Sequence, residues 1–331
     1  MRLWILLNLI FLAECRYSCP DLCSCSFLAS EAEVVCRQNS PSHFPESLLH
    51  PNTTRLSIQS TNLSGIMADH LKAVPFLVNL QLYHTDLTSL PSDLLKNVPH
   101  LNTLDLTGNK LHRLPPDVFC HASLRSLVLK DNLIEQADAD WFPDNSSLTW
   151  IDLSGNRLKE IPAALLHKLP NLENLDLSDN NLRELQSDAL KNLNRLETLN
   201  LAGNRLSSLH PTTFAHNLRL SQLFLQENQL RELPATLLQG LQQLNLLLLT
   251  QNQLQRLPPG LLDGRRSSFQ TILTGNPWVC DERMEYMWRW LNVHAKNVLF
   301  LADVTCVAPE ELKHQPVASL RGGQLGVGTT E

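Results

Sequence analysis

Side chains that could take part in chemistry are numerous in this chain, but they do not form a catalytic or metal-binding set. The 12 histidines are scattered without ligand spacing, and neither His-Glu-x-x-His nor a Gly-x-Ser-x-Gly elbow occurs. The Gly-Asn pairs, such as Gly155-Asn156, belong to a repeat and do not form a phosphate-binding loop. We therefore expect no catalytic residues, no metal and no cofactor, and we predict that the protein is not an enzyme.

The chemistry that remains is recognition of a charged partner. Acidic side chains recur at two positions, three residues apart, of a repeat described below, with Lys130 as the single base near them: Asp105, Asp131, Asp152, Asp176, Asp179 and Glu227. Aromatic and apolar side chains occupy the same or nearby positions of the repeat: Tyr83, Trp150, Phe224 and Leu248. Large apolar side chains on an exposed surface usually mark an interaction site, and the carboxylates favour a cationic partner. Each carboxylate taken alone is equally well an ordinary solvated residue.

A 24-residue period determines the elements that must position these side chains. Asparagines recur with a gap of 23 once and then of 24 six times, at Asn109, Asn132, Asn156, Asn180, Asn204, Asn228, Asn252 and Asn276. Around each lies the spacing Leu172-x-x-Leu175-x-Leu177-x-x-Asn180-x-Leu182. In a short strand, Leu-x-Leu places two leucines on one face and the residue between them on the other. The outward residues of successive strands are then Ser57, Gln81, Asp105, Val128, Asp152, Asp176, Asn200, Phe224, Leu248 and Ile272.

The repeated asparagine lies where the chain turns inward, so its amide can bond backbone groups that the turn leaves open. Thr61 and Thr85 occupy this place in the first turns and can do part of the same work. The second half of each turn, such as residues 233–241, has apolar residues at helix-like spacing for the outer side. No turn can bury its own leucines, so the turns must stack. This leucine-rich repeat signature predicts an α/β solenoid, a horseshoe with a parallel concave sheet.

The ends of the sequence predict a secreted glycoprotein. Residues 1–15 read as a signal peptide, with cleavage after Cys15 or at Ser18 at the latest. Disulfides are the default fate of cysteines in a secreted chain, and the sequons at Asn52, Asn62 and Asn145 become plausible glycan sites. No later apolar stretch is long enough to span a bilayer. A net charge of −6 disfavours nucleic acid or an anionic membrane as the partner.

Cysteines near both ends of the repeats resemble the caps of extracellular leucine-rich repeat proteins. For Cys19, Cys23, Cys25 and Cys36 that resemblance implies the pairs Cys19–Cys25 and Cys23–Cys36, whereas spacing alone leaves three pairings possible. The C-terminal cap of this class usually has four cysteines; only Cys280 and Cys306 are present, so we expect one bridge. Cys120 is left over, either as a small buried apolar residue or as half of an interchain bridge.

These boundaries divide the chain into five segments. A signal peptide (1–15) is followed by an N-terminal cap (16–52), about nine repeats (53–274), a C-terminal cap (275–320) and a flexible tail (321–331).

The region from Cys19 to about Leu320 resembles the secreted leucine-rich repeat glycoproteins of plasma. These include the leucine-rich alpha-2-glycoprotein and the beta-type phospholipase A2 inhibitor of snake plasma. The resemblance includes residues 275–281 (Gly-Asn-Pro-Trp-Val-Cys-Asp) and the spacing Tyr286-x-x-Arg289-Trp290-Leu291. The four-cysteine N-terminal cap and the acidic concave face favour the inhibitor type. That resemblance implies a homotrimer that binds and blocks basic group II phospholipases A2.

Two other functions stay open at this point. The protein could be a plasma binding protein for a growth factor or another cationic protein, as the glycoprotein resemblance implies. It could instead be an adhesion protein of the matrix or cell surface, although the sequence has no segment that would hold it in a membrane. Inhibition of a basic phospholipase would favour the inhibitor, and tight binding without inhibition would favour the plasma binding protein.

Overall fold

The computed structural model describes residues 19, 23–28, 31–37, 43–46, 49–63 and 65–327. The predicted signal peptide and its cleavage site lie outside these residues. No helix within the described residues is long and apolar enough to cross a membrane.

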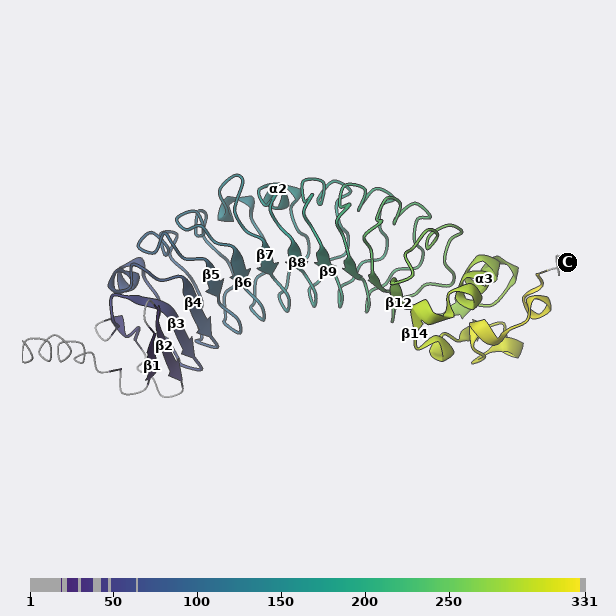
Figure 1. Ribbon diagram of the computed structural model, residues 1–331, viewed down its shortest axis with the longest axis horizontal. Helices are drawn as coiled ribbons and strands as arrows, with labels where there is room; N and C mark the ends of the chain where they lie inside the picture. Colours follow the sequence, from purple (N-terminus) through teal and green to yellow (C-terminus); the bar gives the residue numbers. More distant parts are fainter. Residues whose placement is uncertain are drawn as a thin grey trace, which may run out of the picture.

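Parallel strands, one per repeat, line the inside of an arc (Figure 1). They are β3 (Thr53–Gln59), β4 (Asn79–Tyr83), β5 (Thr103–Asp105), β6 (Ser126–Val128), β7 (Trp150–Asp152), β8 (Asn174–Asp176), β9 (Thr198–Asn200), β10 (Gln222–Phe224), β11 (Leu246–Leu248) and β12 (Gln270–Ile272). Each pairs in parallel with the next, and equivalent residues are partners, as in Asp152↔Asp176. The predicted solenoid with a parallel concave sheet is confirmed.

Alternation along each strand separates the core from the concave face. In β8 the central Leu175 is buried, while Asn174 and Asp176 on either side are partly exposed. Leu177, the next residue in the alternation, is buried again. The apolar residues at these positions, leucine in most repeats, join one continuous core that runs the length of the arc. Since no repeat could bury these leucines alone, the stacking of neighbours supplies the stability.

The convex side contains less helix than the apolar spacing of residues 233–241 suggests. Short helices occur at η2 (Ala68–Ala73), η3 (Ala139–Trp141) and α2 (Ala163–His167), and the other outer segments in the described residues are turns. In residues 233–241 the apolar side chains Leu237, Leu238 and Leu241 are nevertheless buried. A 24-residue repeat leaves too few outer residues for a second full helical turn in most repeats, so single turns bury the same side chains.

Asparagine side chains connect the repeats through backbone groups that would otherwise be buried unpaired. Asn156 is typical: its Nδ2 donates to Leu129 O of the preceding repeat (2.9 Å) and to Leu153 O of its own repeat (3.0 Å). Its Oδ1 accepts from the Ile134 N–H at 3.0 Å. Each asparagine thus connects two repeats and forms a ladder through the core.

The threonines in the same frame do not reproduce these bonds, contrary to our expectation. The Thr85 hydroxyl donates to Asn109 Oδ1 (2.9 Å) and does not bond to a backbone carbonyl. Within the described residues the buried Thr61 hydroxyl has no hydrogen-bond partner. A hydroxyl has a single proton and a shorter reach than an amide, so it cannot connect to several carbonyls.

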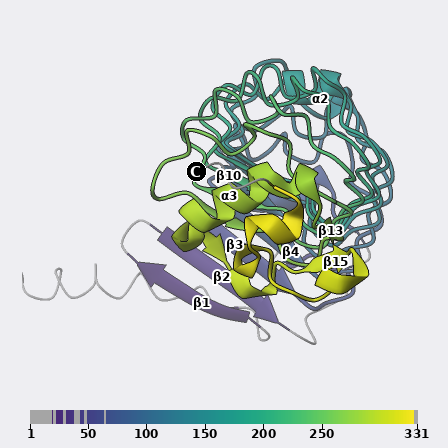
Figure 2. The same cartoon turned by 90° about the vertical axis from the view of Figure 1, so that its right-hand side faces the viewer.

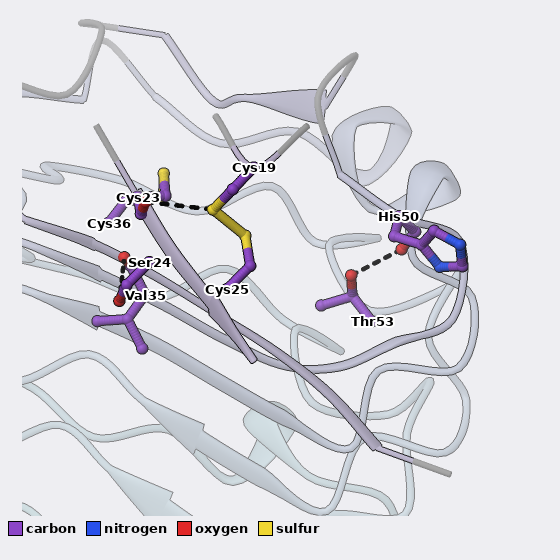
Figure 3. Close-up of a disulfide and its surroundings, with 8 residues drawn as sticks. All are labelled: Cys19, Cys23, Ser24, Cys25, Val35, Cys36, His50 and Thr53. Atoms are coloured by element: carbon purple, nitrogen blue, oxygen red, sulfur yellow. Dashed lines mark hydrogen bonds between the residues drawn. A yellow bond between two sulfur atoms is a disulfide. The ribbon is translucent and has the colours of Figure 1, made fainter. Parts of the chain in front are cut away.

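An antiparallel hairpin closes the N-terminal end of the sheet. Strand β1 (Cys23–Leu28) pairs antiparallel with β2 (Glu31–Arg37), which in turn pairs in parallel with β3. The Cys23–Cys36 disulfide joins the two strands of the hairpin, and Cys19–Cys25 (Figure 3) ties Cys19 to β1. Both bridges have the pairing that the resemblance implies. At the start of β3 the Thr53 hydroxyl donates to His50 O at 2.7 Å, which fixes the entry into the first repeat.

A helical cap closes the other end of the arc (Figure 2). It contains β13 (Trp278–Val279), η4 (Glu282–Met284), α3 (Glu285–Val293), η5 (Ala295–Asn297), β14 (Val298–Leu299), η6 (Leu301–Asp303), β15 (Cys306–Ala308), η7 (Glu310–Leu312), η8 (Val317–Ser319) and η9 (Gly322–Leu325). The expected bridge Cys280–Cys306 is present. Trp290 on α3 packs edge-on against Phe269 of the last repeat. Strand β14 pairs with β12 and so extends the concave sheet into the cap.

The cap continues beyond residue 320, where we expected a flexible tail to begin. Residues 322–325 form η9, and Leu325 and Val327 are buried. The Val327 N–H donates to Gly322 O at 3.0 Å. Burial of these two apolar side chains holds the segment against the cap, and residues 328–331 lie outside the described part.

Candidate protein-binding surface

The structure brings the outward residues of the strands into rows across the concave face. Asp105, Val128, Asp152, Asp176 and Asn200 are consecutive partners along the sheet from β5 to β9. Trp150 projects from the same face of β7 as Asp152, because the buried Ile151 lies between them, and 45% of its surface is exposed. Ser57 is the exception in the predicted row: it is buried, and the Gln59 side chain donates to its hydroxyl at 2.9 Å.

Each aspartate in this row uses one oxygen to fix the turn that follows its strand. Asp152 Oδ1 accepts from the backbone N–H and the hydroxyl of Ser154, at 2.8 and 2.6 Å. Asp176 bonds Ser178 and Asp105 bonds Thr107 in the same way. This is the Asx turn, in which a side chain bonds its own backbone two residues on. These local hydrogen bonds hold the three carboxylates in a fixed orientation. The strand pattern alone did not reveal that the aspartates also stabilise the turns.

The second carboxylate oxygen remains for other contacts. Asp176 Oδ2 accepts from Asn200 Nδ2 at 2.9 Å. In the described part of the chain no hydrogen bond uses Oδ2 of Asp152. Burial raises the pKa of Asp152, and the neighbouring Asp176 adds to this effect, although hydrogen bonds from Ser154 oppose it. Two like charges on adjacent strands and a partly desolvated oxygen favour the approach of a cation.

Tyr83 lies at the N-terminal end of this row. Burial raises its pKa to about 12, and the negative charge of Asp105 and a hydrogen bond to that residue act in the same direction. The hydroxyl is therefore neutral at physiological pH and can donate a hydrogen bond.

The other three predicted acids lie at the edge of the face, beyond the ends of the strands. Asp131, Asp179 and Glu227 are exposed and adopt left-handed backbone conformations, with φ of 52°, 53° and 57°. In each repeat the residue at this place has this conformation, and glycine occupies the place in four of the repeats, as at Gly155 and Gly203. The carboxylates of Asp131 and Asp179 lie directly over these two glycines, so that a Cβ atom would meet their Oδ1 atoms at 2.1 and 2.2 Å. These two acids thus have a packing role in addition to their charge.

We expect Gly155→Ala to destabilise the protein by about 1–2 kcal/mol, because alanine is strained at a positive φ and its methyl group would displace the Asp131 carboxylate. The same substitution in an Asp131→Ala background should cost less, since only the backbone strain then remains. Urea denaturation of the four proteins in this double-mutant cycle measures the difference. An equal cost in both backgrounds would show that Asp131 does not pack on Gly155.

Apolar side chains continue the same row toward the C-terminal cap. Phe224, Leu248, Ile272 and Leu299 are consecutive partners from β10 to β14, and Leu246 lies beside Leu248 on the same face of β11. Leu299 is 42% exposed. We call these five residues the apolar strip. Our sequence reasoning missed Leu299, because it lies outside the asparagine-centred repeat and reaches the sheet only through β14.

Comparison with known proteins agrees with this geometry. The leucine-rich repeat family matches residues 75–129, 122–182 and 170–230, which contain β4 to β10. Residues 75–230, just under half of the chain, are leucine-rich repeats of this family. A phospholipase A2 inhibitor from Gloydius brevicaudus siniticus is 33% identical over 53 residues. That match covers 16% of this chain and 16% of the relative, so the specific activity of the relative does not transfer with it.

Two other kinds of site, for a metal ion and for glycans, concern residues other than the concave row. No group of three or more His, Cys, Asp or Glu side chains that could hold a metal ion occurs among the described residues. The sequon asparagines Asn52, Asn62 and Asn145 are all exposed. Their glycosylation stays a prediction, as does the role of each partner-binding residue.

Cys120 is half-buried and is the one cysteine without a disulfide among the described residues. Its thiol lies 3.5 Å from Asp117 Oδ1. Burial raises its pKa to about 11, and the hydrogen bond and the charge of Asp117 act in the same direction. The residue is therefore more exposed than the small buried residue we had considered, yet it is not activated.

Because the thiolate is the reactive form, Cys120 should react slowly with iodoacetamide at pH 7.5, and its rate should keep increasing as the pH rises toward 11. Asp117→Asn should accelerate the reaction, since removal of the negative charge lowers the pKa. Mass spectrometry of the intact protein over time measures both rates. A rate that reaches its plateau near pH 8.5 would contradict a raised pKa.

Proposed function

We propose that the protein is an extracellular inhibitor that binds a basic phospholipase A2 through its concave face. The observation that carries the proposal is the continuous row in which oriented carboxylates (Asp105, Asp152 and Asp176) lead into the partly exposed apolar strip. The local similarity to a phospholipase A2 inhibitor supports the choice of enzyme class. The disulfides of both caps support an oxidising, extracellular location. Secretion into plasma and assembly into a homotrimer belong to the same proposal.

Electrostatics would determine which phospholipases are captured. The charge on the row is negative, and Lys130 is the single base that influences the Asp152 carboxyl. A basic enzyme would be attracted, whereas an acidic isoform would be repelled, which affects the association rate more than the final affinity. Asp131, Asp179 and Glu227 at the edge would add to this long-range field.

A pull-down with basic and acidic secreted phospholipases A2 tests the proposal, with the activity of each enzyme measured before and after addition of the purified protein. We expect retention and inhibition of the basic enzyme, weakened at high salt because exposed charges are screened. Tight binding of another cationic protein, such as a growth factor, without inhibition of any phospholipase would support the alternative function of a plasma binding protein. No binding of the basic enzyme at low salt would refute the proposed function.

A further inference from the structure

The apolar strip is a continuous run of hydrophobic side chains on the concave face, in which Phe224, Leu246, Leu248 and Ile272 are partly exposed. Its outermost member, Leu299, lies on the cap and not on a repeat, and it is 42% exposed. Pairing of β14 with β12 places Leu299 directly beside Ile272 and extends the strip beyond the last repeat. Contiguous apolar surface of this kind on a water-soluble chain usually marks a binding site.

The acidic part of the row adjoins this strip. Asp176 on β8 and Phe224 on β10 are separated by one strand, on which Asn200 is the paired residue. Neighbouring strands lie about 4.8 Å apart, so the carboxylates begin about 10 Å from the apolar side chains. One partner surface can therefore contact both chemistries at once.

A surface that combines anionic groups with adjacent apolar groups has the two chemistries of an anionic membrane surface. Proteins that dock on such a membrane present the complement: apolar side chains that enter the acyl region, surrounded by basic side chains that contact the headgroups. An enzyme that hydrolyses phospholipids within a bilayer must possess a docking face for lipid. The negative charge of the concave face is complementary to the basic side chains of such a docking face, and its apolar strip is suited to the apolar side chains there.

We propose that the concave face imitates an anionic lipid surface and covers the membrane-docking face of a basic phospholipase A2, while its catalytic pocket stays accessible to small substrates. This inference rests on the proposed function and adds the mode of inhibition. The carboxylates take the place of lipid phosphates, and the apolar strip takes the place of acyl chains.

The test compares two substrates for one basic phospholipase A2. The first is vesicles of phosphatidylglycerol, and the second is a short-chain phosphatidylcholine kept below its critical micelle concentration. We expect the protein to inhibit vesicle hydrolysis at least tenfold more strongly than hydrolysis of the monomeric substrate. It should also prevent co-sedimentation of the enzyme with the vesicles.

Substitution of Leu299 provides the structural test. Leu299→Asp places a charge on the apolar strip beside Ile272, at a side chain that is 42% exposed. We expect it to weaken inhibition of vesicle hydrolysis about tenfold. Leu218→Asp is the matched control: Leu218 is 56% exposed but lies outside the strip, so inhibition should not change.

The outcomes separate this inference from the proposed function. Equal inhibition of both substrates would show that the protein blocks the catalytic pocket, which overturns the inference and leaves the proposed function standing. Equal effects of Leu299→Asp and Leu218→Asp would also overturn it. Absence of any binding to the basic enzyme would refute both.

Discussion

Asn180→Ala is expected to lower the free energy of unfolding by about 3 kcal/mol. Asn180 Oδ1 accepts from the Leu158 N–H at 2.9 Å, and the alanine variant leaves this buried donor without a partner, which costs about 1–3 kcal/mol. The Nδ2 group donates to Leu153 O, Leu177 O and Ser178 O. These three carbonyls also accept from Asn156, Asn204 and the Gly155 N–H, so losing the Asn180 bonds to them costs less. These lost bonds and the cavity left by the side chain account for the rest of the expected loss of about 3 kcal/mol.

Urea denaturation followed by circular dichroism, with the disulfides intact, measures this effect. Asn194→Ala is the control, because Asn194 is exposed, and it should change stability by no more than about 0.5 kcal/mol. Equal stability of the two variants would show that the asparagine ladder is not needed to hold the repeats together.

Replacing Asp152 and Asp176 together by asparagine is expected to weaken binding of a basic phospholipase A2 by about tenfold to a hundredfold at low salt. Close charge pairs across an interface contribute about 1.5 kcal/mol or more each. The fold should be unaffected, because asparagine can form the same turn: Asn200 Oδ1 accepts from the Ala202 N–H at 3.1 Å. Calorimetry at two salt concentrations should show lower affinity and a shallower salt dependence in the variant.

The matched control for this pair is Glu160→Gln with Glu184→Gln. It changes the net charge by the same amount at exposed positions outside the concave row. We expect it to alter affinity by less than about threefold, since exposed charges away from the contact are screened by salt. A loss of affinity equal to that of the aspartate pair would mean that net charge, and not the concave row, attracts the partner.

The same aspartate pair should make binding sensitive to acid. Because burial raises the pKa of Asp152, this carboxyl takes up a proton at a higher pH than an ordinary aspartate does. The affinity of the unmodified protein should therefore fall as the pH decreases through that raised value, and the asparagine pair should lack this fall. A carboxyl whose pKa is raised by folding destabilises the folded protein at pH values at which it is ionised. Asparagine carries no charge, so Asp152→Asn should not lower the melting temperature at neutral pH.

The spacing of leucines and asparagines was enough to predict the repeat, the strands and their register. Leucines and asparagines at a constant spacing can be buried only if the turns stack. Asp152, Trp150 and Phe224 lie next to buried residues in their strands, so alternation predicts that they face the concave surface. The row of candidate residues on one face was predictable for the same reason. The roles of Asp131 and Asp179 were predictable only in part, because their contact with Gly155 and Gly203 joins different repeats.

Only the tertiary structure decided the rest of the surface. Leu299 joins the concave face through the pairing of β14 with β12, which the repeat pattern does not predict. The use of one carboxylate oxygen for the Ser154 and Ser178 turns depends on side-chain geometry that spacing does not encode. A repeat determines which face a residue occupies, because alternation is a local property of the backbone. The neighbours of that residue depend on how nonrepeating segments fold back, and the packing of the whole chain determines this.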